Sequence, residues 1–261
     1  YQLLEPSVER EPSSPARLVA FAEACQELGR IRRGVRAIEQ ARALAPDSHR
    51  ALYVAALLDR DRHRPIDALD AVRRAIALEP RVVEYHVLLG NLLIEAADHT
   101  GAIGAFEAAQ RLAPDDARAF GGLGQALVLV GRDEEGRPLL ERYVERFPGD
   151  GYALYLLGLT RFRHGDFDGA ERDFRRAIQA APHLPAPYHN LARILEATGR
   201  HQEAVSVRER HEEVNDRDWA IQATQRKLVD DPNDEETARS LAKLLRQAGR
   251  SAEAAALQER L

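Results

Sequence analysis

The apolar positions of the chain recur with the period of amphipathic helices, and the clearest example runs from Gly151 to Pro182. Apolar residues spaced three and four apart share one face of a helix, so this stretch predicts two helices joined by a turn and closed by a proline. The same pattern recurs along most of the chain, shifted by 34 residues each time. A period of this length predicts a repeat protein whose neighbouring units bury a continuous core.

Prolines recur in phase with this pattern, where each second helix is predicted to end. Proline disfavours helical geometry in the residue before it, so a proline at this place stops a helix. With proline at about 5% of residues, four further prolines in phase with a first are expected by chance on the order of once in 10⁵ sequences. Intervals of 34 residues separate Pro46, Pro80, Pro114, Pro148 and Pro182, and Pro12 extends the phase backwards.

Small and bulky side chains keep the same register. Positions are counted from 31 residues before the proline of each unit, so that Gly151 is position 1 of the unit that contains Pro182. Small residues at positions 8 and 20 predict a close crossing of the two helices of a unit. At position 8 they are Ala22, Ala56, Gly90, Gly124, Gly158 and Ala192, and at position 20 they are Gly34, Ala68, Ala102, Gly136, Ala170 and Ala204. A bulky residue at position 24 is expected to fill the space between units, as Ile38, Val72, Phe106, Leu140 and Phe174. Left-handed glycines are expected to end first helices, at Gly29, Gly131, Gly165, Gly199 and Gly249.

These residues together resemble the tetratricopeptide repeat family, whose 34-residue helix-turn-helix units stack into a right-handed superhelix. The resemblance covers nearly the whole chain. It implies an all-α, right-handed α-solenoid of about six to seven repeats. The predicted segments are a leader or remnant of a preceding repeat (1–14), six repeats (15–48, 49–82, 83–116, 117–150, 151–184 and 185–218), an inserted helix (219–233) and a C-terminal repeat or cap (234–261).

The inserted helix is predicted because the pattern fails in the sixth unit. Its bulky and small positions hold Arg208 and His211, and the next Asp-Pro pair ends at Pro232, 50 residues after the last proline in phase. This spacing exceeds the 34-residue period by about the length of one helix. Asn215-Asp216 is the expected break and cap before it, and the inserted helix contains the only tryptophan, Trp219.

Composition excludes several classes of function. A net charge of −5 gives no electrostatic reason to expect nucleic acid or an anionic membrane as a partner. No apolar run is long enough to cross a bilayer. The single cysteine, Cys25, rules out an internal disulfide and is expected to be a buried thiol. Methionine is absent, even at position 1, which indicates a processed product or an excised fragment. The compartment therefore stays open between cytoplasmic, periplasmic and secreted.

No pattern in the chain indicates catalysis, a metal or another cofactor. There is no glycine-rich phosphate loop, no paired metal-ligand motif and no nucleophile elbow. The nine histidines are scattered, and two prolines separate His183 from His189. Acidic pairs such as Asp115-Asp116 precede new helices, where capping explains them. The expected protein is therefore non-enzymatic.

The resemblance places a binding surface on the first helices of the repeats, which line the concave groove where ligand peptides lie in this family. Carried onto this sequence, the groove positions predict these partner-binding residues: Tyr53, Leu57, Arg60, Asn91, Arg118, Gly121, Gly122, Gln125, Tyr152, Tyr155, Leu159, Phe162, Asn190 and Arg193. A protein or peptide segment is the expected partner. The family's carboxylate clamp requires a lysine that is missing at every equivalent position, which argues against chaperone C-termini as ligands.

Within this set, Tyr152, Tyr155, Leu159 and Phe162 form a stripe along one face of one helix. Tyrosines there would supply rigid contact area with a polar tip. The alternative is that the stripe packs on the neighbouring helix as ordinary core. Gly121-Gly122 costs about 1 kcal/mol per glycine relative to alanine in mid-helix, which indicates close approach either of a ligand backbone or of a neighbouring unit.

Polar members of the set suggest further roles. The side chains expected to orient an acidic partner are Arg60, Arg118 and Arg193. The amides of Asn91, Gln125 and Asn190 are expected to bond a ligand backbone, and they also fit a substrate-selecting repeat region of a larger enzyme, for example a glycosyltransferase. A third alternative is a structural subunit that self-associates through the ends of its superhelix or around Trp219.

Overall fold

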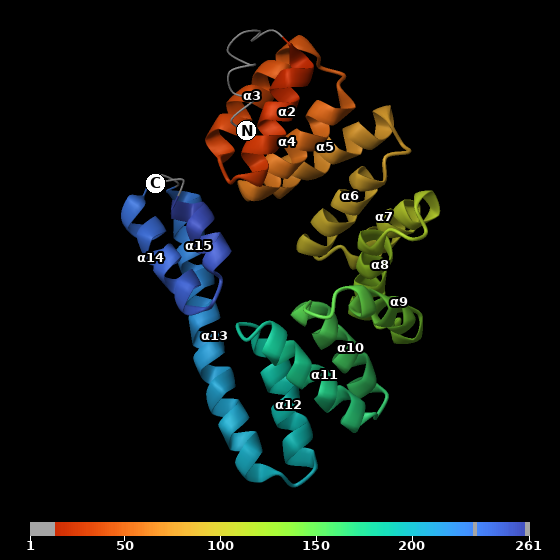
Figure 1. The fold of residues 1–261 in the computed structure, drawn as a ribbon, viewed down its shortest axis with the longest axis vertical. Helices are drawn as coiled ribbons and strands as arrows, with labels where there is room; N and C mark the ends of the chain where they lie inside the picture. The colour runs from red at the N-terminus through yellow and green to blue at the C-terminus, as the bar shows by residue number, and fades with distance from the viewer. Residues whose placement is uncertain (1–13, 232–233, 259–261) are drawn as a thin grey trace. The chain divides into compact units, whose positions relative to one another are not determined.

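The computed structural model describes residues 14–231 and 234–258, and these residues form helices that pack in consecutive pairs (Figure 1). No strand occurs within those ranges. The predicted leader lies almost entirely outside the described residues. The helices are α2 (Pro15–Glu27), α3 (Ile31–Leu44), α4 (His49–Asp61), α5 (Pro65–Leu78), α6 (Val83–Glu95), α7 (His99–Leu112), α8 (Ala117–Leu129), α9 (Asp133–Arg146), α10 (Gly151–Arg163), α11 (Phe167–Ala180), α12 (Pro185–Ala197), α13 (His201–Asp230), α14 (Glu235–Gln247) and α15 (Ser251–Gln258).

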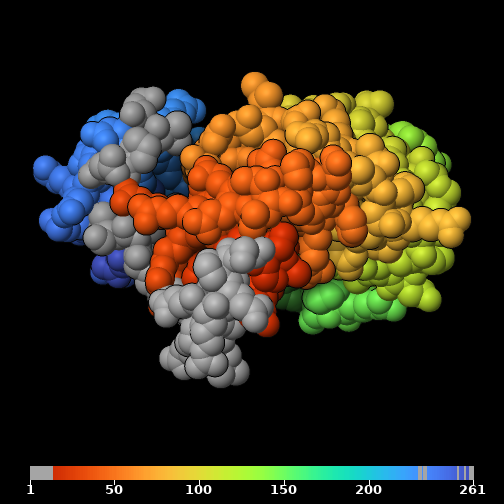
Figure 2. All heavy atoms as spheres, turned by 90° about the horizontal axis from the view of Figure 1, so that it is seen from above, coloured from red at the N-terminus to blue at the C-terminus, as the bar shows by residue number. Residues whose placement is uncertain are grey.

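The chain divides into two compact units, the first ending at Gly122 and the second beginning at Leu123, within α8. Each unit has its own buried core. In the first unit the side chains of α2 to α5, red to orange in Figure 2, lie closely packed against one another. In the second unit two clusters join α10 to its neighbours on either side, and a third lies between α13, α14 and α15.

The predicted close crossing within each pair is confirmed by the surroundings of the small residues. A Cβ added to Gly158 would lie 3.3 Å from the carbonyl oxygen of Ala170 and 2.8 Å from the Phe174 ring. A Cβ on Gly34 would lie 3.2 Å from the carbonyl oxygen of Ala22. Glycine and alanine are required here because the two backbones leave no room for a larger side chain.

The bulky residues of position 24 are confirmed as core. The five side chains are all buried, and the rings of Phe106 and Phe174 are fully so. A Cβ on Gly90 of α6 would lie 2.6 Å from the Phe106 ring, so this glycine is needed for the ring to fit. A residue that is large in α7 is thus matched by one that is small in α6, as close packing requires.

The predicted left-handed glycines are confirmed at the ends of the first helices. Gly29, Gly131, Gly165, Gly199 and Gly249 have φ between 70° and 81°. Two residues that are not glycine, His63 and Ala97, adopt the same conformation with φ of 55° and 60°. They stand 34 and 68 residues after Gly29, at the equivalent position of the next two repeats. The backbone at this position is therefore left-handed even where a side chain disfavours that conformation.

The predicted break at Asn215-Asp216 is wrong, because α13 runs without interruption from His201 to Asp230. The additional helical residues before the last pair are present as its second half. Each half has its own buried contacts: Val207 packs on the α10–α12 core, and Ile221 lies in the core with α14 and α15. Because both halves are held by packing, the two exposed polar residues between them stay helical.

None of the described helices, α13 included, is both long and apolar enough to cross a membrane.

Candidate binding surface

The predicted tyrosine and leucine of the first unit contribute mainly to packing. Tyr53 and Leu57 on α4 are half-buried against the core that contains Leu88. The Tyr53 ring stacks on Tyr85 of α6 with centroids 4.9 Å apart, and burial raises the pKa of the Tyr53 hydroxyl. Asn91, on α6, is exposed.

Two of the three predicted orienting arginines are already paired with carboxylates of the chain. Arg60 Nη2 lies 3.3 Å from Asp61 Oδ1. Arg118 Nη2 lies 2.6 Å from Asp116 Oδ2 and 3.2 Å from Glu84 Oε1. The hydrogen bonds to these carboxylates raise the pKa of Arg118. Both guanidinium groups therefore serve contacts within the first unit.

Of the paired glycines of α8, Gly122 has a packing role. Gly121 is buried and Gly122 is half-buried. A Cβ on Gly122 would overlap the ring of Phe106, so its missing side chain makes room for a residue of the preceding pair. Close approach of the preceding helical repeat, through the Phe106 ring, accounts for the glycine at position 122. Gln125, four residues after Gly121, is half-buried in the second unit.

The aromatic stripe on α10 is part core and part surface. Tyr152 is 38% exposed, whereas Tyr155, Leu159 and Phe162 are half-buried. Tyr155 lies with its ring centroid 6.0 Å from that of Tyr152 on one side and 6.0 Å from that of Phe174 on the other. Burial raises the pKa values of both tyrosines. The stripe thus contributes both to the core and to the exposed surface.

The structure brings residues of α12 against this stripe. The Arg193 guanidinium lies over the Phe162 ring, with its Cζ 4.8 Å from the ring centroid. Asn190 is buried; its Nδ2 donates to the carbonyl oxygen of Ala186 at 3.2 Å, and its side chain is close enough to the Tyr155 hydroxyl to oppose the rise in its pKa. An amide, a guanidinium and aromatic rings therefore meet where α10 and α12 are in contact.

Two histidines extend the same surface. The rings of His189 on α12 and His211 on α13 lie with centroids 5.5 Å apart. His211 is not among the predicted site residues. A signal was available, since the position it occupies is alanine in four earlier units, at Ala41, Ala75, Ala109 and Ala177. We refer to the following set as the aromatic surface: Tyr152, Tyr155, Leu159, Phe162, His189, Asn190, Arg193 and His211.

Ion pairs hold the helices that carry the aromatic surface. Next to Phe162, Arg163 Nη1 donates to Asp133 Oδ1 at 2.8 Å and to the carbonyl oxygen of Val128 at 3.1 Å. The Asp133 side chain is 7% exposed. Charge-assisted hydrogen bonds to a buried carboxylate are among the stronger polar contacts in proteins, so this contact fixes α10 against the end of α8 and the start of α9.

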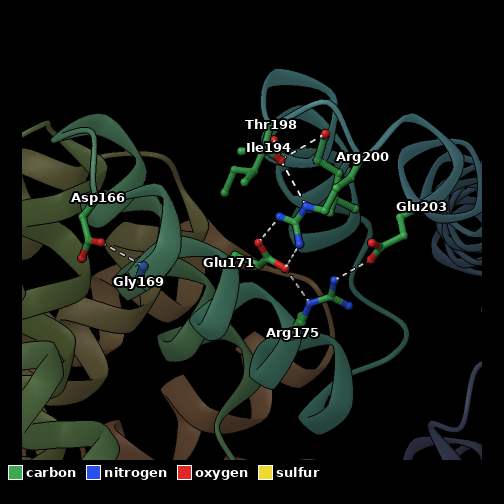
Figure 3. Close-up of polar contacts among 9 residues, drawn as sticks. Asp166, Gly169, Glu171, Arg175, Ile194, Thr198, Arg200 and Glu203 are labelled. Atoms are coloured by element: carbon green, nitrogen blue, oxygen red, sulfur yellow. Dashed lines mark hydrogen bonds and ion pairs between the residues drawn. The ribbon is translucent and has the colours of Figure 1, made fainter.

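A second network fixes the start of α13 (Figure 3). Glu171 on α11 accepts hydrogen bonds from Arg200, the residue that precedes α13, and from Arg175, whose Nε lies 3.0 Å away. Arg175 also donates to Glu203 on α13 at 3.1 Å. The bonds from Arg200 lower the pKa of Glu171. The network ties α11 to the helix that carries His211.

No group of three or more histidine, cysteine, aspartate or glutamate side chains among the described residues is arranged to hold a metal ion. The thiol of Cys25 is buried, as predicted.

Family and structural comparisons agree with this geometry. Sequence models of the tetratricopeptide repeat family match residues 53–117, 87–151 and 122–185, and a further model of that family matches residues 161–228.

Among curated relatives, the chain is similar to anaphase-promoting complex subunit 7 of Arabidopsis thaliana, with 27% identity over 170 residues, which is 64% of this chain and 30% of that protein. The chain spans about a third or less of the length of the curated relatives that it matches. Among solved structures, it is similar to MamA from Desulfovibrio magneticus, with a TM-score of 0.57, 21% identity and coverage of 65% of this chain and 96% of that one. It is also similar to YrrB, described as a TPR protein with an unusual peptide-binding site, with a TM-score of 0.59, 19% identity and coverage of 72% and 96%.

Proposed function

Because the chain belongs to the tetratricopeptide repeat family, we propose that it is a non-enzymatic interaction scaffold whose aromatic surface binds an extended or helical segment of a protein partner. A relative is by name a subunit of a protein complex, and one structural neighbour is described as having a peptide-binding site. These names support a protein as the class of partner.

The observation that carries the proposal is the meeting of α10 and α12. Rings from α10 lie beside the Asn190 amide and the Arg193 guanidinium from α12. Aromatic side chains bury large areas at low entropic cost, which is why they dominate binding hot spots. A partner segment that covers Tyr152 and the exposed edges of Tyr155 and Phe162 would gain affinity from apolar burial.

The polar groups around these rings would set the position of the segment. The Asn190 amide is held by its hydrogen bond to the carbonyl oxygen of Ala186, so its orientation is fixed before a ligand arrives. Fixed side chains lose little entropy on binding. The guanidinium of Arg193 is likewise positioned by the Phe162 ring.

Replacement of Tyr155 and Phe162 by alanine tests the proposal. Capture of the native partner is expected to fall at least tenfold, because two hot-spot side chains are lost. Since both residues also touch core, Tyr152→Ala is a second variant whose side chain is more exposed. Phe147→Ala is the matched control, because Phe147 is also an exposed aromatic residue and directly follows α9. Undiminished capture by folded Tyr155→Ala/Phe162→Ala protein would refute the assignment.

Self-association is a second candidate, and one observation favours it. Trp219 on α13 is 71% exposed, and tryptophan is enriched in protein interfaces. If this side chain joins two copies, light scattering will show a molar mass that rises with concentration in the parent and stays constant in Trp219→Ala. A constant monomer mass in the parent would exclude it.

A further inference from the structure

Arg193 differs from the other predicted orienting arginines in its charge balance. Arg60 and Arg118 are each paired with carboxylates. Within the described part of the chain, no carboxylate pairs with Arg193, whose guanidinium rests on the Phe162 ring instead. A cation held on an aromatic face keeps its outward edge available for an anion.

The neighbours of Arg193 add positive charge when they take up protons. His189 is exposed on the same helix, and its ring lies 5.5 Å from that of His211 on α13. Although His189 is exposed overall, partial desolvation of its ring, the proximity of His211 and the charge of Arg193 lower its pKa. Protonation of His189 therefore places a second positive charge near that of Arg193, and a bound anion would relieve their repulsion.

Among the described residues, the charged groups that act on His189 are His211 and Arg193, and no carboxylate is among them. From α10 come the uncharged Tyr155 and Phe162, and α11 contributes Phe174 and Ile178 to the core that they share. On α13, Arg208 and Arg210 are paired with Glu196 and Glu213 respectively. Glu196 also accepts from His201 at 2.7 Å. The carboxylates of Glu196 and Glu213 are thus engaged with other partners.

We propose that the segment bound at the aromatic surface carries an aspartate or glutamate whose carboxylate is received by Arg193, His189 and His211, and that its binding tightens as pH falls from 7.5 to 5.5. This inference rests on the proposed function and names the chemistry of the partner. Charge complementarity carries it, since the three groups form a cationic cluster next to apolar rings.

The size of the pH effect follows from linkage. A carboxylate favours the protonated form of a nearby histidine. If it raises the pKa of one histidine by one unit, the affinity below both values exceeds the affinity above them about tenfold. Aspartate and glutamate stay ionised over this range, so the change reports the histidines of the protein.

The test starts from peptides selected on the full chain at pH 6.0 from a random 12-residue phage-display library. Each selected peptide is synthesised with a fluorescent label, once as selected and once with its acidic residues replaced by the corresponding amides. Fluorescence anisotropy then gives Kd at pH 7.5 and 5.5. The expected result is a set of acidic peptides that bind several-fold more tightly at pH 5.5 than at pH 7.5, with little pH effect for the amide versions.

Substitutions show which residues cause the pH dependence of peptide binding. His189→Gln/His211→Gln is expected to abolish the ratio of affinities between the two pH values, whereas His86→Gln on α6 keeps the parent's ratio. Arg193→Gln is expected to weaken binding about tenfold, and Arg172→Gln, an exposed arginine on α11, controls for net charge. Should the double histidine variant fail to fold, NMR titration of the parent replaces it: the pKa values of His189 and His211 must rise when the acidic peptide binds.

The two ways to fail are distinguishable. Peptides that need Tyr155 and Phe162 but carry no acid, or bind equally at both pH values, would overturn this inference and leave the proposed function standing. Peptides whose binding ignores Tyr155 and Phe162 would overturn both.

Discussion

Arg193 and Phe162 form a cation–π contact between neighbouring first helices, with the guanidinium carbon 4.8 Å from the ring centroid. The contact links α12 to the aromatic stripe of α10. Of the three predicted orienting arginines, Arg193 is the one without a carboxylate partner in the described chain, and the contact holds it next to the half-buried rings. Charge and apolar area thus come together on the same surface.

This contact predicts energetic coupling between the two residues. Exposed cation–π pairs contribute about 0.5–1 kcal/mol. The double-mutant cycle of Arg193→Ala and Phe162→Leu, measured by urea unfolding, is expected to give a coupling energy of that size. Arg172→Ala with Phe162→Leu is the control pair and is expected to be additive. Additivity of the Arg193 pair within about 0.3 kcal/mol would show that the contact contributes nothing.

The caps at His63 and Ala97 predict two stabilising substitutions. Both residues are held at positive φ, which costs about 1–2 kcal/mol for residues other than glycine. Replacement by glycine removes that cost but adds freedom to the unfolded chain worth about 0.4–1 kcal/mol. A net gain of about 0.5–1 kcal/mol in unfolding free energy is expected for each. Gly165→Ala, with φ of 80°, should change stability in the opposite direction. Loss of stability in both glycine variants would contradict the cap assignment.

Helix propensity alone would favour alanine at position 122, but the contact of Gly122 with Phe106 predicts that this substitution destabilises the protein. Alanine is the better helix former by about 1 kcal/mol, yet its Cβ at position 122 would overlap the Phe106 ring. Gly122→Ala is therefore expected to destabilise by about 1–3 kcal/mol, as overpacking does. Gly104→Ala, where a Cβ meets nothing within 4 Å, should instead be stabilising. If chemical denaturation finds the two variants alike, the packing role of Gly122 is wrong.

The Glu171 network predicts a stability that depends on pH. Hydrogen bonds from Arg200 and Arg175 lower the pKa of Glu171 in the folded protein. A group of this kind stabilises above its unfolded pKa, and the contribution disappears as pH falls through the folded value. Glu171→Gln is expected to cost about 1–2 kcal/mol at pH 7, and this difference should shrink toward pH 3.

The control for that prediction is Glu203→Gln, because Glu203 is 54% exposed in its pair with Arg175. Exposed pairs contribute at most about 1 kcal/mol. A difference between Glu171→Gln and the parent that does not change between pH 7 and pH 3 would mean that the carboxylate has no ionisation-dependent role.

The fold was predictable because it depends on residues that recur in register. Small residues such as Gly158, large ones such as Phe174 and caps such as Gly165 each leave a periodic signal, and each is confirmed. The continuity of α13 was not predictable from local signals. Asn215-Asp216 is typical of a cap, and packing of the two halves on separate cores overrides it.

The candidate surface was predictable only in part. The α10 stripe follows from helical spacing, but the pairing of Arg118 with Asp116 and Glu84 depends on side-chain geometry that no spacing specifies. The approach of His211 to His189 depends on how α13 crosses α12. Such contacts between side chains distant in sequence need the packed structure.

Site-specific photocrosslinking tests the central claim most directly, because it reports where a partner lies. A photoreactive phenylalanine analogue is placed at Tyr152, or at Phe147 as the control, in the full chain expressed in its source organism. Both side chains are exposed, 38% and 46% respectively, and they lie near opposite ends of one turn between helices. A crosslinked protein segment from position 152 that is lost in Tyr155→Ala/Phe162→Ala is the predicted result. A segment captured from position 147 but not from position 152 would contradict the account.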